Sequence, residues 1–274
     1  MAGRLSGKVA FIMGAGSVGD APTGEDSPAC WGNGRAAAVL YAREGAKVYA
    51  VDLDPESSEA TRKIIAAEGG DGLSGQADAT RADQVERAVG ACIDAFGRID
   101  ILHNNVGGSA IGGPVDMGED IWDANIEMNL KSVFLTCKYI LPLMERQGKG
   151  AIVNISSVAA LCCGLGRSMV SYHTAKAGLI QFSRAVGIQY AKKGIRSNCV
   201  IPGLMHTPLV AHRLAAQYGK GDAEALIRQR DAQCPTGKMG NAWDVAYASI
   251  FLASDEAKYI NATEIVVDGG FSAV

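Results

Sequence analysis

The sequence predicts an α/β protein with one doubly wound domain, in which helices cover both faces of a mostly parallel, seven-stranded sheet. Three observations favour this fold class. Short apolar segments alternate with segments of helical periodicity along the whole chain. The first of them, Lys8–Met13, is a continuous apolar run of the kind found in strands buried on both faces. No internal repeat or linker divides the 274 residues, so we expect one domain over residues 1–274.

The expected elements follow one another along the chain. The strands are Lys8–Met13, Lys47–Asp52, Leu73–Ala77, Ile99–His103, Ala151–Ile155, Ile195–Ile201 and Glu264–Val267. The helices are Gly34–Tyr41, one capped by Asp54-Pro55, one ending at Phe96, Glu119–Arg146, one from Ser171 to about Lys193, and Ala242–Ala253.

Composition excludes several functional classes. A net charge of -3 without a basic patch argues against nucleic-acid binding. The four histidines are scattered, and none pairs with a cysteine at metal-ligand spacing, so we expect no metal. Seven cysteines without a C-x-x-C motif fit reduced thiols. No signal peptide or membrane-spanning run is recognisable, and the expected location is cytoplasmic.

A glycine-rich loop follows the first strand. Gly14, Gly16 and Gly19 spell the dinucleotide-binding pattern G-x-G-x-x-G, but the two prolines of Asp20–Pro28 prevent a helix from starting there. We therefore predict a split loop, with an insertion over about residues 18–31. Its two halves are Gly14-Ala15-Gly16-Ser17 and Gly32-Asn33-Gly34.

Each part of this split loop has an expected role. Gly14 makes the tight turn, Gly32 lets the backbone approach a pyrophosphate, and Gly34 lets the helix pack on the strand. The alternative is a flexible glycine loop without a ligand.

Asp52 ends the second strand, about 18 residues after Gly34. A carboxylate at this place accepts hydrogen bonds from an adenosine ribose and repels a 2′-phosphate. Leu53 and Asp54 supply no compensating cation, so the sequence favours NAD over NADP. Leu53 counts among the expected cofactor contacts, whereas Asp54 is expected to cap the next helix.

Tyr172 and Lys176 lie four residues apart in Ser171–Ala177, which places them on one face of a helix. A tyrosine titrates near ~10 when unperturbed, and a fixed ammonium beside it favours the phenolate. Such pairs are common on helices, so their surroundings decide their meaning.

Taken together, these motifs resemble the short-chain dehydrogenase/reductase family over essentially the whole chain. The resemblance rests on an ordered set: the glycine loop, Asp52, Asp78, Asn104-Asn105-x-Gly107, Asn129, Ser157, Tyr172-x-x-x-Lys176, Pro202-Gly203 and Val267-Asp268-Gly269-Gly270. It implies a Rossmann-like fold and an oxidoreductase acting on CH–OH groups.

The resemblance also implies the roles of individual residues. The catalytic tetrad is Asn129, Ser157, Tyr172 and Lys176; Asn125 competes with Asn129, and Ser156 with Ser157. The expected cofactor contacts are Gly14, Gly16, Ser17, Gly32, Asn33, Gly34, Asp52, Leu53, Asp78, Ala79, Asn104, Tyr172, Lys176, Pro202, Gly203 and Thr207. Asp78 and Ala79 meet the adenine, Asn104 lines the adenosine side, and Asn105 ties strands together.

The implied reaction interconverts a secondary alcohol and a ketone with NAD, and the implied assembly is a homotetramer. An NADPH-dependent carbonyl reductase and a catalytically silent NAD-binding sensor or scaffold are the alternatives. Two departures affect the phosphate contacts. Met13 replaces the threonine that usually precedes the first glycine, and the loop carries the insertion.

The substrate is specified only in outline. Apolar side chains are available from Ile111, Leu161, Leu165, Met169, Leu204, Met205 and Leu209, which suggests a moderately apolar alcohol or a ring hydroxyl. Arg167, His206, His212 and Arg213 could bind a polar tail, although the expectation is that each is solvated. The polar region over about residues 204–235 is a candidate lid.

Overall fold

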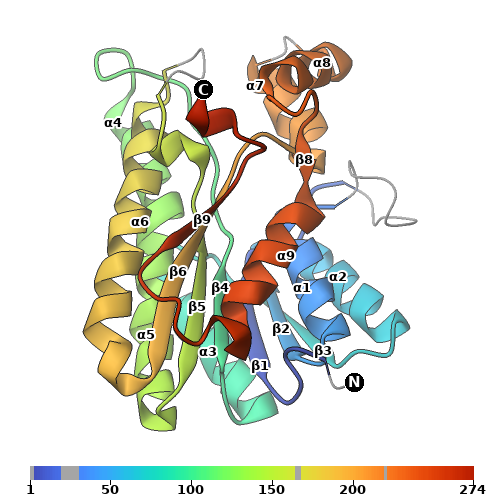
Figure 1. Ribbon diagram of the computed structural model, residues 1–274, viewed down its shortest axis with the longest axis vertical. Helices are drawn as coiled ribbons and strands as arrows, with labels where there is room; N and C mark the ends of the chain where they lie inside the picture. The colour runs from blue at the N-terminus through green and yellow to red at the C-terminus, as the bar shows by residue number, and fades with distance from the viewer. Residues whose placement is uncertain (1–2, 20–30, 164–167, 219–220) are drawn as a thin grey trace.

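A parallel sheet organises the fold (Figure 1). The structure, a computed structural model, describes residues 3–19, 31–163, 168–218 and 221–274. Within these residues the main sheet has seven strands in the order β3-β2-β1-β4-β5-β6-β9, and every neighbouring pair is parallel. The strands are β1 (Val9–Met13), β2 (Lys47–Asp52), β3 (Gly72–Gln76), β4 (Ile101–Asn104), β5 (Gly150–Ile155), β6 (Ile195–Pro202) and β9 (Glu264–Val267).

Helices connect the strands and cover both faces of the sheet. They are α1 (Asn33–Arg43), α2 (Pro55–Ala67), α3 (Ala82–Phe96), α4 (Glu119–Ile126), α5 (Ser132–Gln147), α6 (Val170–Tyr190), α7 (Ala215–Tyr218), α8 (Ala223–Gln233) and α9 (Ala242–Ala253). The expected fold class is confirmed.

The core consists of two layers, one on each face of the sheet. Ile12 packs in the cluster with α1, α2 and α9, whereas the adjacent Phe11 packs in the cluster with α3, α5 and α6. Both side chains are fully buried, because neighbouring residues of a strand point to opposite faces. Each buried side chain of this size contributes roughly 1.5–3 kcal/mol. This explains the continuous apolar run in the sequence.

The strand order reverses between β1 and β4. The chain first builds β1, β2 and β3 towards one edge, and then returns to place β4 on the other side of β1. The connections after β1 and β4 therefore diverge at the carboxyl ends of the strands, which leaves a crevice between them.

Two regions differ from the sequence-based expectation. The predicted helix Glu119–Arg146 is interrupted by a π-helical turn at Glu127–Lys131. The polar region before Pro235 is largely structured: it holds the short strand β7 (Met205–His206), a π-helical turn at Val210–Leu214, and helices α7 and α8. β7 pairs with β8 (Gly240–Asn241) in a separate two-stranded sheet. Among the described helices, none is long and apolar enough to cross a membrane.

Candidate active site

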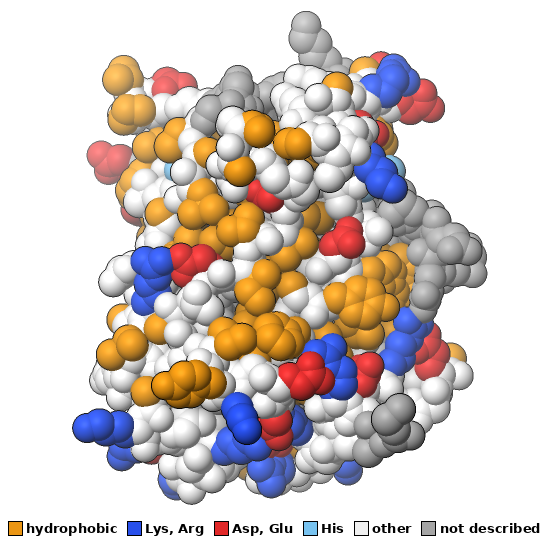
Figure 2. Space-filling model, viewed as in Figure 1, with side chains coloured by type: hydrophobic (Ala, Val, Ile, Leu, Met, Phe, Trp, Pro, Cys, Tyr) orange, Lys and Arg blue, Asp and Glu red, His pale blue; other side chains and the backbone are white. Residues whose placement is uncertain are grey.

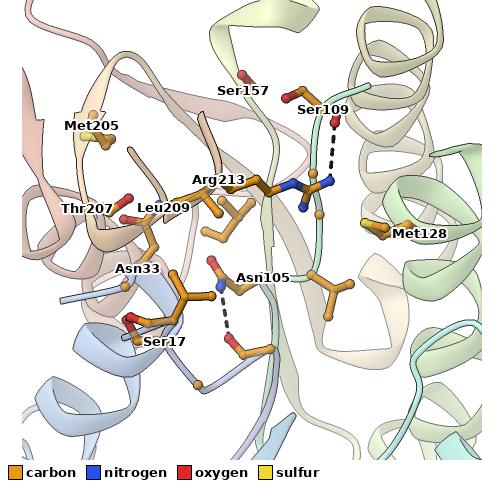
Figure 3. A pocket seen from close by; sticks show the side chains of 18 of the residues that line it. Ser17, Asn33, Asn105, Ser109, Met128, Ser157, Met205, Thr207, Leu209 and Arg213 are labelled. Carbon is orange, nitrogen blue, oxygen red and sulfur yellow. Dashed lines mark hydrogen bonds between the residues drawn. The ribbon is translucent and has the colours of Figure 1, made fainter. Parts of the chain in front are cut away.

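A cavity of about 1170 Å³ opens at the carboxyl ends of the strands, over the crevice between β1 and β4. Fifteen of the predicted site residues line it, and Figure 3 shows several of them. They are Gly14, Gly16, Ser17, Gly32, Asn33, Asp52, Leu53, Asp78, Ala79, Ser157, Tyr172, Lys176, Pro202, Gly203 and Thr207. The other three, Gly34, Asn104 and Asn129, lie behind its wall.

The glycine loop brings the N-terminus of α1 against the end of β1. Gly14 has φ +85°, a conformation that favours glycine. A Cβ on Gly34 would lie 1.8 Å from the Gly14 carbonyl oxygen, so only glycine fits there. Gly34 therefore packs helix on strand, as its expected role requires, and does not face the cavity.

The N-terminus of α1 forms one end of the cavity. Gly32 precedes the helix and has no side chain, so no capping side chain accepts hydrogen bonds from the first backbone N–H groups of α1. The Asn33 Oδ1 atom is buried and has no hydrogen-bond partner among the described residues. Unsatisfied donors at a helix N-terminus, beside glycines that admit a close approach, fit the pyrophosphate of a dinucleotide.

The Asp52 carboxylate is fixed between two backbone donors. Gly16 N donates to Oδ2 at 2.8 Å, and Asp54 N donates to Oδ1 at 3.2 Å. The side chain of Asp54 accepts a bond from Glu56 N at 3.0 Å and caps α2, as expected. Asp52 is therefore positioned at the cavity, while the neighbouring carboxylate is occupied by the helix cap.

Arg35 is a cavity residue that the sequence reading missed. Its side chain is only 1 % exposed, with Nε donating to Thr61 Oγ1 at 3.2 Å and Nη2 to the Ser17 carbonyl oxygen at 3.5 Å. Nη1 has no partner among the described residues. Burial lowers the pKa of the guanidinium, and the nearby Asp52 carboxylate opposes this shift. The only signal was a basic residue directly after Gly34.

The structure changes the expectation for one of the two asparagines at the end of β4. Asn104 does not line the cavity: its Nδ2 donates to Asn154 Oδ1 at 2.8 Å, and its Oδ1 accepts from Thr136 Oγ1 at 2.7 Å inside the sheet. Asn105 lines the cavity and donates to the Gly14 carbonyl oxygen at 3.0 Å. The expectation for Asn104 is therefore corrected, because its side chain points into the sheet.

Lys176 is a buried ammonium on α6. Its side chain is 3 % exposed, and Nζ donates to the Ile155 carbonyl oxygen at 2.9 Å. The same atom lies 5.9 Å from the ring centroid of Tyr172, one turn earlier on the helix. Burial lowers the pKa of Lys176 from 10.5 to about 8. The expected Tyr172–Lys176 pair is thus brought together at the cavity. With a pKa of about 8, Lys176 is mainly protonated at neutral pH.

The two candidate serines have different surroundings. The Ser156 hydroxyl is buried and donates to the Lys176 carbonyl oxygen at 2.9 Å, which holds α6 against β5. Ser157 lies at the cavity (Figure 3) and accepts a bond from Ala159 N at 3.2 Å. This geometry supports the choice of Ser157.

Asn129 is fully buried in the π-helical turn and supports the cavity wall from behind. Its Oδ1 accepts from Gly108 N at 3.1 Å, and its Nδ2 donates to the Gly108 carbonyl oxygen at 2.9 Å. Asn125 also donates to that oxygen. A Cβ on Gly107 would lie 2.7 Å from Asn129 Oδ1 and 2.8 Å from Lys176 Nζ. Asn129 is thus the amide placed next to the ammonium.

The other end of the cavity has an apolar wall. Of the expected apolar residues, Met169, Leu204, Met205 and Leu209 line it, together with Val158. Ile111 and Leu161 are instead about half exposed and lie outside it. Leu165 lies outside the described residues.

The basic residues also differ from expectation. Arg213, expected to be solvated, lines the cavity, whereas His206 and His212 do not. Arg167 lies outside the described residues.

Two expected segments bear on access to the cavity. The region over residues 204–235 contributes Thr207, Leu209 and Arg213 to the lining; its movement as a lid stays a prediction. The insertion at about 18–31 falls mostly outside the described residues. At its first end Val18 and Gly19 line the cavity, and at its last end Trp31 packs on Trp243 of α9, with ring centroids 4.7 Å apart.

The fold and the cavity together define a class of protein. A doubly wound parallel sheet, a glycine loop at the switch point, and a Tyr–Lys pair with a serine at the strand ends are the components of a Rossmann-fold oxidoreductase.

Comparison with known proteins specifies the family. Residues 29–272 match the family model described as enoyl-(acyl carrier protein) reductase. The chain is 35% identical over 272 residues to 2,5-dichloro-2,5-cyclohexadiene-1,4-diol dehydrogenase LinX from Sphingobium indicum, with 99% of both chains covered. The chain belongs to the short-chain dehydrogenase/reductase family, whose members generally bind nicotinamide cofactors.

Solved structures agree with this assignment. A Burkholderia xenovorans protein, provisionally assigned to the same family, is 48% identical, with a TM-score of 0.91 and coverage of 100% of this chain and 99% of that one. Levodione reductase is 31% identical, with a TM-score of 0.88 and coverage of 98% and 99%. The coarse function that follows is an oxidoreductase acting on CH–OH groups.

The burial of Lys176 predicts a stability cost. Lys176→Met should raise the free energy of unfolding at pH 7 by about 2 kcal/mol, because it removes a desolvation penalty of about 3 kcal/mol and loses one hydrogen bond worth about 1 kcal/mol. The folded-state pKa of about 8 lies below the unfolded value of 10.5, so the unfolded chain binds more protons between these values and wild-type stability rises across that window. The difference between the two proteins should therefore shrink above pH 8.

Urea unfolding at pH 7, 9 and 10, at fixed protein concentration, measures this difference. Lys192→Met, at an exposed lysine just beyond α6, is the control and should stay within about 0.5 kcal/mol of wild type. A Lys176→Met variant less stable than wild type at pH 7 would contradict the interpretation.

Proposed function

We propose that this protein is an NAD-dependent oxidoreductase that interconverts a secondary alcohol and a ketone, with Tyr172 as the acid–base residue. The observation that carries the proposal is the buried Lys176 ammonium beside Tyr172, at the strand-end cavity. A buried charge of this kind is costly and is typical of functional sites.

The residues divide the chemistry among them. Ser157 donates a hydrogen bond to the substrate oxygen and orients it. Tyr172, as phenolate, takes the hydroxyl proton, and in the reverse direction it protonates the developing alkoxide. The Lys176 ammonium favours the phenolate. Asn129 fixes Gly108 through two hydrogen bonds, and the preceding Gly107 lies beside that ammonium. When bound, NAD supplies the hydride acceptor for the carbinol carbon.

The adenosine end of the cavity favours NAD over NADP. The carboxylates of Asp52, Asp54, Glu56 and Asp78 all line it, whereas Arg35 is the cation at this end among the described lining residues. Arg35 is buried and bonded to Thr61 and Ser17. The excess of negative charge at this end of the cavity therefore opposes a 2′-phosphate.

The apolar wall and the relatives support a ring or branched secondary alcohol. The wall includes Val158, Met169, Leu204, Met205 and Leu209. The similar Sphingobium protein is named as a dehydrogenase of a cyclic diol. We propose a substrate of comparable shape, with its hydroxyl directed at Ser157 and Tyr172.

The location of the protein is also part of the proposal. The six described cysteines are free thiols, which fits the expected cytoplasmic location.

Exposed apolar side chains support the expected homotetramer. Three apolar side chains are exposed on α9, on β9 and in the segment that joins them: Tyr247, Val266 and Tyr259. Figure 2 shows apolar side chains gathering over the face that α9 and β9 form. A second exposed set comes from helices packed on the other side of the sheet: Ile121 of α4, Phe134 of α5 and Ile188 of α6. Two separate apolar faces provide the two interfaces that a tetramer with dihedral symmetry needs.

Light scattering should therefore give four times the 28.5 kDa mass of one chain. Tyr247→Asp and Phe134→Asp should each reduce the assembly to a dimer. A monomeric wild-type protein at micromolar concentration would contradict the proposal.

Turnover tests the catalytic assignment. A panel of cyclic and acyclic secondary alcohols with NAD identifies a substrate, and Tyr172→Phe should then lower kcat at least about 100-fold, because it removes the proton acceptor. The Kd for NAD should change less than about threefold.

Tyr190→Phe, on the same helix but outside the cavity lining, serves as the control. Wild-type protein that binds NAD but oxidises no alcohol in the panel would favour the silent sensor or scaffold instead.

The cofactor preference depends on Asp52. Asp52→Asn should lower the ratio of kcat/KM with NAD to that with NADP by at least about tenfold, since it removes the charge that repels the 2′-phosphate. Asp54→Asn is the matched control, because asparagine also caps a helix and the charge change is the same. Equal wild-type efficiency with both cofactors would show the NAD assignment to be wrong.

A further inference from the structure

Arg213 reaches into the cavity from the segment after β7. It belongs to the π-helical turn Val210–Leu214, and its side chain extends across the cavity towards the loop that follows β4 (Figure 3). Its Nη2 donates to the Ser109 carbonyl oxygen at 3.4 Å. Segments more than a hundred residues apart in the chain thus meet at one guanidinium.

The guanidinium has more donors than the described residues satisfy. Arginine carries five N–H donors, and the bond to Ser109 is long. No carboxylate forms an ion pair with Arg213 in the part of the chain that the structure describes. Glu127, the acidic residue in the lining beside Met128, is paired with Lys131. A partly buried guanidinium without a counter-charge among the described residues can donate hydrogen bonds to an anion and neutralise its charge.

Gly108 gives this guanidinium its place. A Cβ there would lie 2.6 Å from Arg213 Nη1, so the absence of a side chain lets the planar group lie against the backbone. The preceding Gly107 makes room for Lys176 in the same way, because a Cβ on Gly107 would lie 2.8 Å from Lys176 Nζ. The two cations therefore lie against consecutive residues of one loop, and both line the same cavity as Tyr172. An anion bound by Arg213 would share this cavity with a carbinol at Tyr172.

We propose that the natural substrate of this enzyme is a hydroxy acid whose carboxylate is bound by Arg213. The inference rests on the proposed alcohol oxidation and adds the substrate's charged group. Arginine binds a carboxylate through two parallel hydrogen bonds, which fixes orientation as well as charge. The apolar wall then receives the carbon skeleton between the carboxylate and the reacting hydroxyl.

The cofactor's phosphates have a separate place. The glycines of the split loop, the N-terminus of α1 and Arg35 form the end of the cavity that fits a pyrophosphate. Arg213 instead contacts Gly108 and Ser109, next to Gly107, against which Lys176 lies. Its charge is therefore assigned to the substrate.

Matched acids and esters test this assignment. The probes are 3-hydroxybutanoate and 4-hydroxycyclohexanecarboxylate, each compared with its methyl ester. Wild-type kcat/KM should be higher for at least one acid than for its ester, and Arg213→Gln should lower that acid-to-ester ratio at least tenfold. Arg213→Lys, which keeps the charge but not the planar fork, should give an intermediate ratio. His212→Gln, an exposed neighbour outside the cavity lining, should leave the ratio unchanged.

A binding measurement distinguishes failure of the proposed alcohol oxidation from failure of the proposed carboxylate site. Calorimetry of cyclohexanecarboxylate with NAD-loaded enzyme should show binding that Arg213→Gln weakens at least tenfold, while the Kd for NAD changes less than threefold. If no alcohol is oxidised but this carboxylate binding holds, the proposed function fails and the anion site stands. An acid-to-ester ratio that Arg213→Gln leaves unchanged, or a large loss of NAD affinity in that variant, would overturn the assignment to a substrate carboxylate.

Discussion

The close contact between Gly14 and Gly34 is the constraint on which the rest of the site depends. A Cβ on Gly34 would lie 1.8 Å from the Gly14 carbonyl oxygen, so α1 can start against the end of β1 only because no side chain intervenes. This contact directs the helix N-terminus into the crevice opened by the reversal of strand order between β1 and β4. Asn105 then joins the crevice's two sides through its bond to Gly14.

Charges at the two ends of the cavity are held in different ways. Arg35 is buried and bonded to Thr61 and Ser17, beside the Asp52 carboxylate, so it braces the glycine loop. Lys176 is equally buried but donates only to a backbone carbonyl among the described partners, and its positive charge acts on the neighbouring Tyr172. Burying a charge lowers the stability of the fold. In this protein the two buried charges each act on another group: Arg35 positions the glycine loop, and Lys176 acts on Tyr172.

Much of the architecture could be predicted because it depends on local patterns. The apolar runs located all seven strands of the main sheet, within one or two residues of their ends, and the capping role of Asp54 followed from Asp-Pro. Asn104 was wrongly assigned to the cavity, because the pattern does not say which of the two asparagines points into the sheet. The region before Pro235 also has more helix than its polar composition indicated.

The sequence by itself determined the fold class and the order of the motifs, since strand periodicity, glycine turns and helix caps act over a few residues. The tertiary structure alone decided which polar groups are buried together. In the sequence, Arg35 looks like an ordinary helix residue, and Arg213 is one of four basic residues expected to be solvated. Their charges became informative only when packing brought Arg35 beside Asp52, and Arg213 across the cavity to Ser109. The physical reason is that burial and electrostatic environment depend on segments far apart in the chain.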